Sequence, residues 1–72
     1  MIKCKNSPPI PAVGSDIEVS LFADTKDEVK DDVSEMTIVG FPEGYDIDMG
    51  SSVMTAAGEV AFRKSNGTWN WI

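Results

Sequence analysis

The sequence predicts an all-β protein: a small antiparallel meander of about four to six short strands behind an extended, proline-rich N-terminal arm. Three observations predict it. Apolar and polar residues alternate along residues 16–24, which is typical of a half-buried strand. Residues 51–72 hold three strand-like runs separated by turns. Proline is concentrated before residue 12, where it disfavours sheet pairing.

Residues 1–15 are the expected arm, and residues 16–72 are the expected single β domain. Proline has no backbone N–H and holds its neighbours in extended conformations. The three prolines of the arm are Pro8, Pro9 and Pro11. The arm is either a loosely ordered terminus or a segment that lies on a neighbouring subunit. In the second case its apolar anchors are Ile2, Ile10 and Val13.

The first predicted strand of the domain covers residues 16–24. One face of this strand is apolar and comprises Ile17, Val19, Leu21 and Ala23. Successive side chains of a strand point to opposite faces, so the other face carries Glu18, Ser20 and Asp24. Phe22 interrupts that polar face. It either covers an edge of the sheet or marks a contact surface.

Residues 24–35 contain six acids and two lysines, a net charge of −4. A short helix is one interpretation, but only Val29 and Val33 would anchor it. A solvated acidic loop is the expected alternative. The length also matches a calcium-binding loop, which Lys26 at the third position and Val29 at the sixth exclude.

Residues 36–41 and 45–49 are predicted as two further strands, with a turn at Pro42 and Gly44 between them. Asp46 and Asp48 share one face of the second strand. Two carboxylates are too few ligands for a cation, so these acids are expected to face solvent.

The closing meander is predicted over residues 52–57, 59–65 and 68–72. Asn66-Gly67 between apolar runs favours a type I′ hairpin turn. Trp69 and Trp71 share one face of the last strand. Paired aromatic rings on one face usually pack into a core, although such a pair can also form a sugar-stacking platform.

Seventy-two residues with one cysteine and no histidine make a single small domain without an internal disulfide. A domain of this size buries only about 60% of its unfolded surface. Oligomerisation or docking on a larger surface is therefore the expected stabiliser. The chain is predicted to be a homo-oligomer.

The net charge of −6 argues against nucleic acid and anionic membranes as partners. No apolar run is long enough for a secretory signal or a membrane span. The chain is therefore expected to be made in the cytoplasm.

Catalysis is not expected. Histidine is absent as a base, and no serine or cysteine has a recognisable nucleophile setting. Neither a phosphate-binding glycine loop nor a cluster of metal ligands occurs. The chain is thus predicted to be a non-enzyme without cofactors.

Several segments, in their order, resemble small structural proteins of tailed bacteriophages and prophages of Gram-positive hosts, of the head-decoration or head-fibre-like kind. The similarity covers residues 19–72, and its motifs lie at 20–29, 40–47, 50–62 and 65–71. They include a Phe-Pro-x-Gly-Tyr turn, a Gly-Ser strand entry and a terminal Ser-x-Gly-x-Trp. Residues 1–15 have no clear counterpart.

The resemblance implies a virion structural protein that decorates or cements the capsid surface. Its implied partners are the major capsid protein or another virion protein, and further copies of itself as a trimer or larger assembly. Its implied location is the virion, after synthesis in the bacterial host cytoplasm. No catalytic residues carry over.

Two alternatives come from other classes. The chain could be a tail or baseplate accessory, or a receptor-binding module that uses Trp69 and Trp71. It could also be an acidic cytosolic phage inhibitor that imitates nucleic acid through the acids of residues 24–35.

Overall fold

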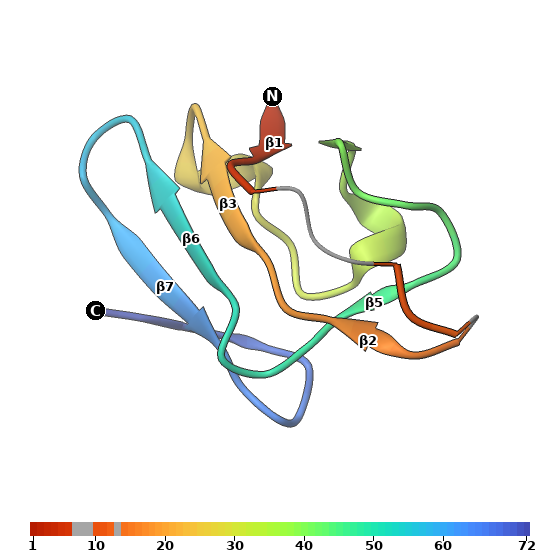
Figure 1. Cartoon of the computed structure of the whole chain (residues 1–72). Coiled ribbons are helices and arrows are strands. Elements are labelled where there is room, and N and C mark those ends of the chain that lie inside the picture. Colours follow the sequence, from red (N-terminus) through yellow and green to blue (C-terminus); the bar gives the residue numbers. More distant parts are fainter. Residues whose placement is uncertain (7–9, 13) are drawn as a thin grey trace.

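A computed structural model describes residues 1–6, 10–12 and 14–72 of the chain (Figure 1). Within these ranges it contains eight short strands, two 3₁₀ helices and no α-helix. The strands are β1 (Ile2–Cys4), β2 (Asp16–Ile17), β3 (Ser20–Ala23), β4 (Ile38–Val39), β5 (Asp46–Ile47), β6 (Ser52–Thr55), β7 (Val60–Arg63) and β8 (Trp69–Trp71). The 3₁₀ helices are η1 (Lys26–Glu28) and η2 (Val33–Glu35). The predominance of strands is as the sequence predicts.

The topology differs from the expected antiparallel meander. Six strands form one sheet in the order β4-β1-β3-β6-β7-β8, and β2 pairs with β5 separately. Three of the pairs are parallel: β1 with β4, β2 with β5, and β3 with β6. Parallel neighbours need a long crossover connection, and residues 24–51 supply it between β3 and β6. Only β6, β7 and β8 form a meander.

The first strand also corrects the expected N-terminal arm. β1 lies inside the sheet, where Lys3 pairs with Phe22 on one side and with Val39 on the other. Ile2 is buried in the core rather than free to anchor on a neighbour. The prolines begin only after this strand, so they do not prevent its pairing.

The rest of the predicted arm is described only in part. Ile10 is exposed, and the carbonyl of Pro11 accepts a hydrogen bond from the Tyr45 hydroxyl at 2.9 Å. Val13 lies outside the described residues, so its predicted anchoring role stays a prediction.

The strand predicted over residues 16–24 is divided into β2 and β3. β2 leaves the main sheet to pair with β5, but the predicted alternation continues through the break. Its apolar face is buried throughout: Ile17, Val19, Leu21 and Ala23. Between β2 and β3, the Val19 N–H donates to Ser51 Oγ at 2.9 Å, which holds this segment against the one that leads into β6.

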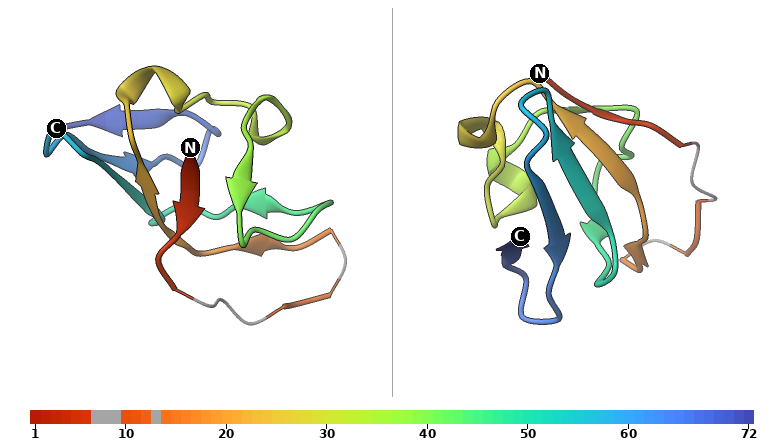
Figure 2. Two further views of the ribbon diagram at one scale, coloured as in Figure 1. Left: turned by 90° about the horizontal axis from the view of Figure 1, so that it is seen from above. Right: turned by 90° about the vertical axis from the view of Figure 1, so that its left-hand side faces the viewer.

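The main sheet is curved, and η1 and η2 lie on its concave side (Figure 2). The core fills the space between them and includes Ile2, Leu21, Val53, Ala61 and Trp69. The acidic segment of residues 24–35 is therefore neither one helix nor an open loop. Val29 and Val33 pack against the core from this segment. No helix of the described residues is long and apolar enough to cross a membrane.

Acidic side chains stabilise the two short helices at their starts. The Glu28 carboxylate accepts the N–H of Thr25 at 3.0 Å, and the Asp32 carboxylate accepts the N–H of Ser34 at 2.9 Å. These contacts satisfy donors that a helix start leaves free. Part of the acidity that the sequence shows is thus used to hold local structure.

Candidate functional site

The convex side of the six-stranded sheet carries the side chains that point away from the core. We name this surface the open face. Its residues are Lys3, Ser20, Phe22, Val39, Ser52, Met54, Val60, Phe62 and Asn70. Met54 is 41% exposed and Phe62 is 43% exposed. Large apolar side chains at that exposure, gathered on one surface, are typical of a contact region.

The pairing register sets these residues in rows across the strands. Lys3 lies beside Phe22, Phe22 beside Met54, and Met54 beside Val60. The neighbouring row is Ser20, Ser52, Phe62 and Asn70. The first row is apolar except at one end, where Lys3 Nζ lies 6.0 Å from the centre of the Phe22 ring.

The centre of the open face is uncharged, and charged residues lie at its margins. Lys3 is at one end of the apolar row. The alternation that buries Ile17, Val19 and Ala23 puts Glu18 and Asp24 on the same side as Phe22, beyond the two ends of β3.

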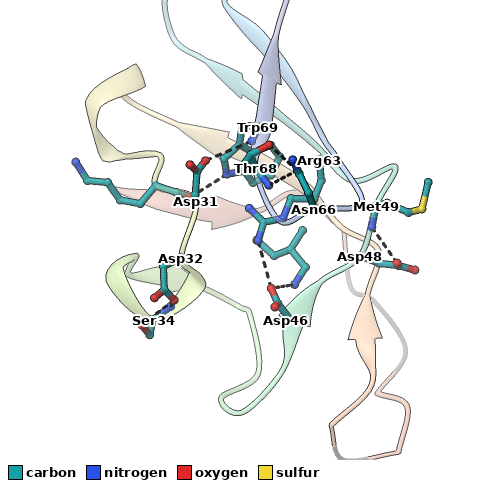
Figure 3. Close-up of polar contacts among 12 residues, drawn as sticks. Asp31, Asp32, Ser34, Asp46, Asp48, Met49, Arg63, Asn66, Thr68 and Trp69 are labelled. Carbon is teal, nitrogen blue, oxygen red and sulfur yellow. Dashed lines mark hydrogen bonds and ion pairs between the residues drawn. The ribbon is translucent and has the colours of Figure 1, made fainter.

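The opposite, concave side holds a buried arginine (Figure 3). Arg63 on β7 is only 5% exposed, and its guanidinium lies 5.1 Å from the centre of the Trp69 ring. Its Nη2 is 3.4 Å from Asp46 Oδ1 on β5. Its Nε and Nη1 have no hydrogen-bond partner in the described part of the chain. A buried charge with one carboxylate partner is costly, so this contact joins the two sheets without fully satisfying the guanidinium.

Other acids surround this side of the molecule. A cavity of about 150 Å³ is lined by Asp16, Asp46, Asp48, Arg63 and Lys64, among others. A larger groove of about 810 Å³ has acidic residues on a partly apolar surface that includes Phe41 and Tyr45. No group of three or more acidic, cysteine or histidine side chains in the described ranges could hold a metal ion.

The perturbed pKa values near these surfaces have structural causes. The Ser34 hydroxyl and N–H hold the pKa of Asp32 below its usual value, with a smaller effect from the charge of Arg63. Burial raises the pKa of the Cys4 thiol, which keeps it protonated and weakly nucleophilic.

The predicted site residues are distributed over three environments. Phe22 is half-buried on β3. This strand lies between β1 and β6, so Phe22 does not cover an edge of the sheet, and its role in a contact surface stays a prediction. Trp69 and Trp71 are on the concave side. Ile2 is in the core, and Ile10 is exposed and belongs to no strand.

The two tryptophans serve the core and one sheet edge. Trp69 is 8% exposed, and its Nε1 donates to the Lys30 carbonyl at 2.8 Å. Its backbone N–H donates to Asp31 Oδ1 at 3.3 Å. This bond gives a partner to an N–H of β8, a strand at the edge of the sheet. Lys26 Nζ lies 4.7 Å from the Trp71 ring centre. The predicted packing role of the pair is thus observed for Trp69.

Replacing Trp69 with phenylalanine is expected to destabilise the fold by about 1–2 kcal/mol, because it removes the donor to the Lys30 carbonyl. Urea unfolding monitored by circular dichroism measures this change. Trp71→Phe is the matched control, since Trp71 is half-buried and its ring makes no hydrogen bond to any residue that the structure describes. Equal effects of the two substitutions would contradict the assigned role of Nε1.

Sequence reasoning missed the exposure of Met54 and Phe62. The alternation in residues 52–57 and 59–65 shows which side chains share a face. Both faces of these strands are apolar, however, so periodicity cannot tell which one is buried. The missing signal is the position of residues 24–37, which cover only one side (Figure 2).

No protein-family model, curated protein or solved structure matches this chain.

Proposed function

We propose that this protein is a structural component of a bacteriophage virion that decorates or cements the capsid surface. The observation that carries the proposal is the open face, where Met54 and Phe62 are partly exposed beside Phe22. Such a surface fits a protein that works in an assembly. The resemblance of residues 19–72 to phage structural proteins supports the virion as that assembly.

Size and charge agree with this role. A 72-residue domain has a small core and gains stability from any partner that binds the folded form. The net charge of −6 would keep the outer surface of a particle hydrated and repel nucleic acid. The proposed role needs no catalysis and no cofactor.

The two alternatives receive less support. A receptor-binding platform would need the faces of Trp69 and Trp71 free, but Trp69 is buried. A nucleic-acid mimic would need free acids in residues 24–35. Asp31 and Asp32 are instead engaged by Trp69 and Ser34.

Purified phage particles test the proposal. Quantitative mass spectrometry of gradient-purified particles is expected to find the protein at many copies per particle, and immunogold labelling is expected to place it on the head. Its presence in infected cells together with its absence from particles would overturn the proposal. Labelling confined to the tail would favour the accessory role.

A single substitution tests whether the open face is the surface that binds the particle. Met54→Lys introduces a charge into the apolar row and is expected to lower the copy number per particle at least several-fold. Met49→Lys is the matched control, because Met49 is 60% exposed and lies outside the open face. Equal incorporation of both variants would show that another surface makes the attachment.

A further inference from the structure

We infer that the groove of about 810 Å³ binds an extended polypeptide segment of a partner protein, and that this segment carries lysine or arginine side chains. Residues of η2, the first residue of β4 and the loop from β4 to β5 line the groove, together with one residue each of β2 and β5. The inference goes beyond the proposed function, because it concerns a different surface from the open face and holds for a virion protein or for any other.

Charge complementarity selects a basic occupant. Of the 12 acids in the chain, four line the groove: Asp16, Asp32, Glu43 and Asp46. None of the six basic residues, all of which the structure describes, is part of this lining. Arg63 Nη2 lies 3.4 Å from Asp46 Oδ1, but the arginine side chain is only 2% exposed (Figure 3). A groove with charge of one sign concentrates ligands of the opposite sign.

Two of these acids are neighbours across a strand pair. Asp16 on β2 is paired with Asp46 on β5, so the two side chains point to the same side of the two-stranded sheet. Like charges at paired positions repel each other. Arg63 reaches Asp46, whereas Asp16 makes no ion pair with any residue that the structure describes. A cationic side chain between the two carboxylates would remove the repulsion that remains in the free chain.

Apolar side chains beside the acids favour a polypeptide over a simple cation. Met36, Phe41 and Tyr45 line the same groove and are half-buried. The aliphatic stem of a lysine or arginine packs on such side chains while its charged head reaches a carboxylate. A cation also binds over the face of an aromatic ring. The Tyr45 hydroxyl donates to the Pro11 carbonyl at 2.9 Å, which restrains the ring in the groove wall.

The groove also lies beside an edge of the six-stranded sheet. Its lining includes Met36, Thr37 and Ile38, the residues that lead into β4. Within the described ranges β4 is an end strand that pairs with β1 alone. The Ile38 carbonyl accepts the Phe41 N–H at 3.5 Å, which is longer than the usual range of about 2.7–3.2 Å.

An extended segment can add to such an edge through its backbone while every second side chain enters an adjoining pocket. The occupant is therefore expected to be extended, with a basic residue at alternate positions. The apolar residues between them would lie outside the groove or against the end strand.

A synthetic peptide tests the inference. The probe is the acetylated and amidated heptapeptide Lys-Val-Lys-Val-Arg-Val-Lys, added stepwise to the isotope-labelled chain and followed by heteronuclear NMR. Backbone amide signals are expected to shift at residues 36–38 and 43–46 and to stay unchanged at residues 52–54 and 60–62 of the open face. The expected Kd is on the order of 0.1 mM. Raising the ionic strength from about 0.02 M to about 0.3 M is expected to weaken binding several-fold, because salt screens exposed charges.

Two acids of the groove can be neutralised while the fold is kept. Asp16→Asn removes one of two neighbouring like charges, and Glu43→Gln changes an exposed residue. Each substitution is expected to weaken binding of the probe several-fold at low salt. Asp27→Asn is the matched control, because it removes the same charge from an exposed residue of η1 outside the groove lining. Its Kd is expected to equal that of the wild-type chain. Thermal unfolding checks that each variant is folded.

Four outcomes would overturn the inference: absence of binding, amide shifts centred on another surface, equal binding of a heptapeptide with glutamate at each basic position, and equal weakening by Asp27→Asn. Spermidine, added in the same way, represents a small cation. Equal affinities of spermidine and the probe would also overturn the polypeptide as occupant. None of these results bears on the proposed function, which the composition of particles and the Met54→Lys variant test. Absence of the protein from particles would in turn leave binding at the groove unaffected.

Discussion

Replacing Leu21 with alanine is expected to destabilise the protein by about 2–5 kcal/mol, the usual cost of emptying a core leucine site. Leu21 is 1% exposed on β3, between Cys4 on β1 and Val53 on β6. Its side chain fills the centre of the concave side. Total stability for a small domain is only about 5–15 kcal/mol, so a substantial unfolded fraction is expected at elevated temperature.

Urea unfolding at fixed protein concentration measures this loss. Met54→Ala is the control. Like Leu21, Met54 is a large apolar residue of the sheet, but it is partly exposed on the open face of the neighbouring strand β6. The control is expected to cost about 1 kcal/mol or less. Equal losses for the two variants would show that the open face is as well packed as the core, and would contradict the assignment of the two sides.

Replacing Asp46 with alanine is expected to cause the second large loss of stability. Asp46→Ala leaves the Arg63 guanidinium buried without its ion-pair partner. Breaking a buried ion pair usually costs about 3–5 kcal/mol. The Asp46 side chain is 62% exposed and water screens the pair, so about 1–3 kcal/mol is expected.

Removing the arginine instead is expected to have the opposite outcome. Arg63→Met replaces a buried charge with an apolar side chain that can still pack on Trp69, and should be neutral or stabilising. In that background, Asp46→Ala should then cost almost nothing. Thermal and urea unfolding of the two single variants and the double variant give the coupling energy. Additive losses would show that Asp46 stabilises the fold through another contact, such as its bond to the Ile47 N–H.

Local patterns in the sequence determined much of the strand content. The alternation from Ile17 to Ala23 predicted the buried face of that segment, because the two-residue period of a strand is a local property. The Asn66-Gly67 pair predicted the last hairpin, but its type I′ turn was wrong. That turn needs a positive φ at both residues, and Gly67 adopts one whereas Asn66 does not. The Gly67 N–H donates to the Lys64 carbonyl at 3.1 Å, so the loop is one residue longer than the predicted turn. Phe22 stands out in the sequence because it interrupts a polar face.

Tertiary structure alone decided how the strands pair and which surface is left open. The placement of β1 between β3 and β4 and the parallel pairing of β3 with β6 depend on residues far apart in the chain, and no turn signal marks such contacts. The burial of Arg63 and the exposure of Met54 and Phe62 depend on which side of the sheet residues 24–37 cover. A strand's period shows which residues share a face, but the covering segment decides which face becomes the core.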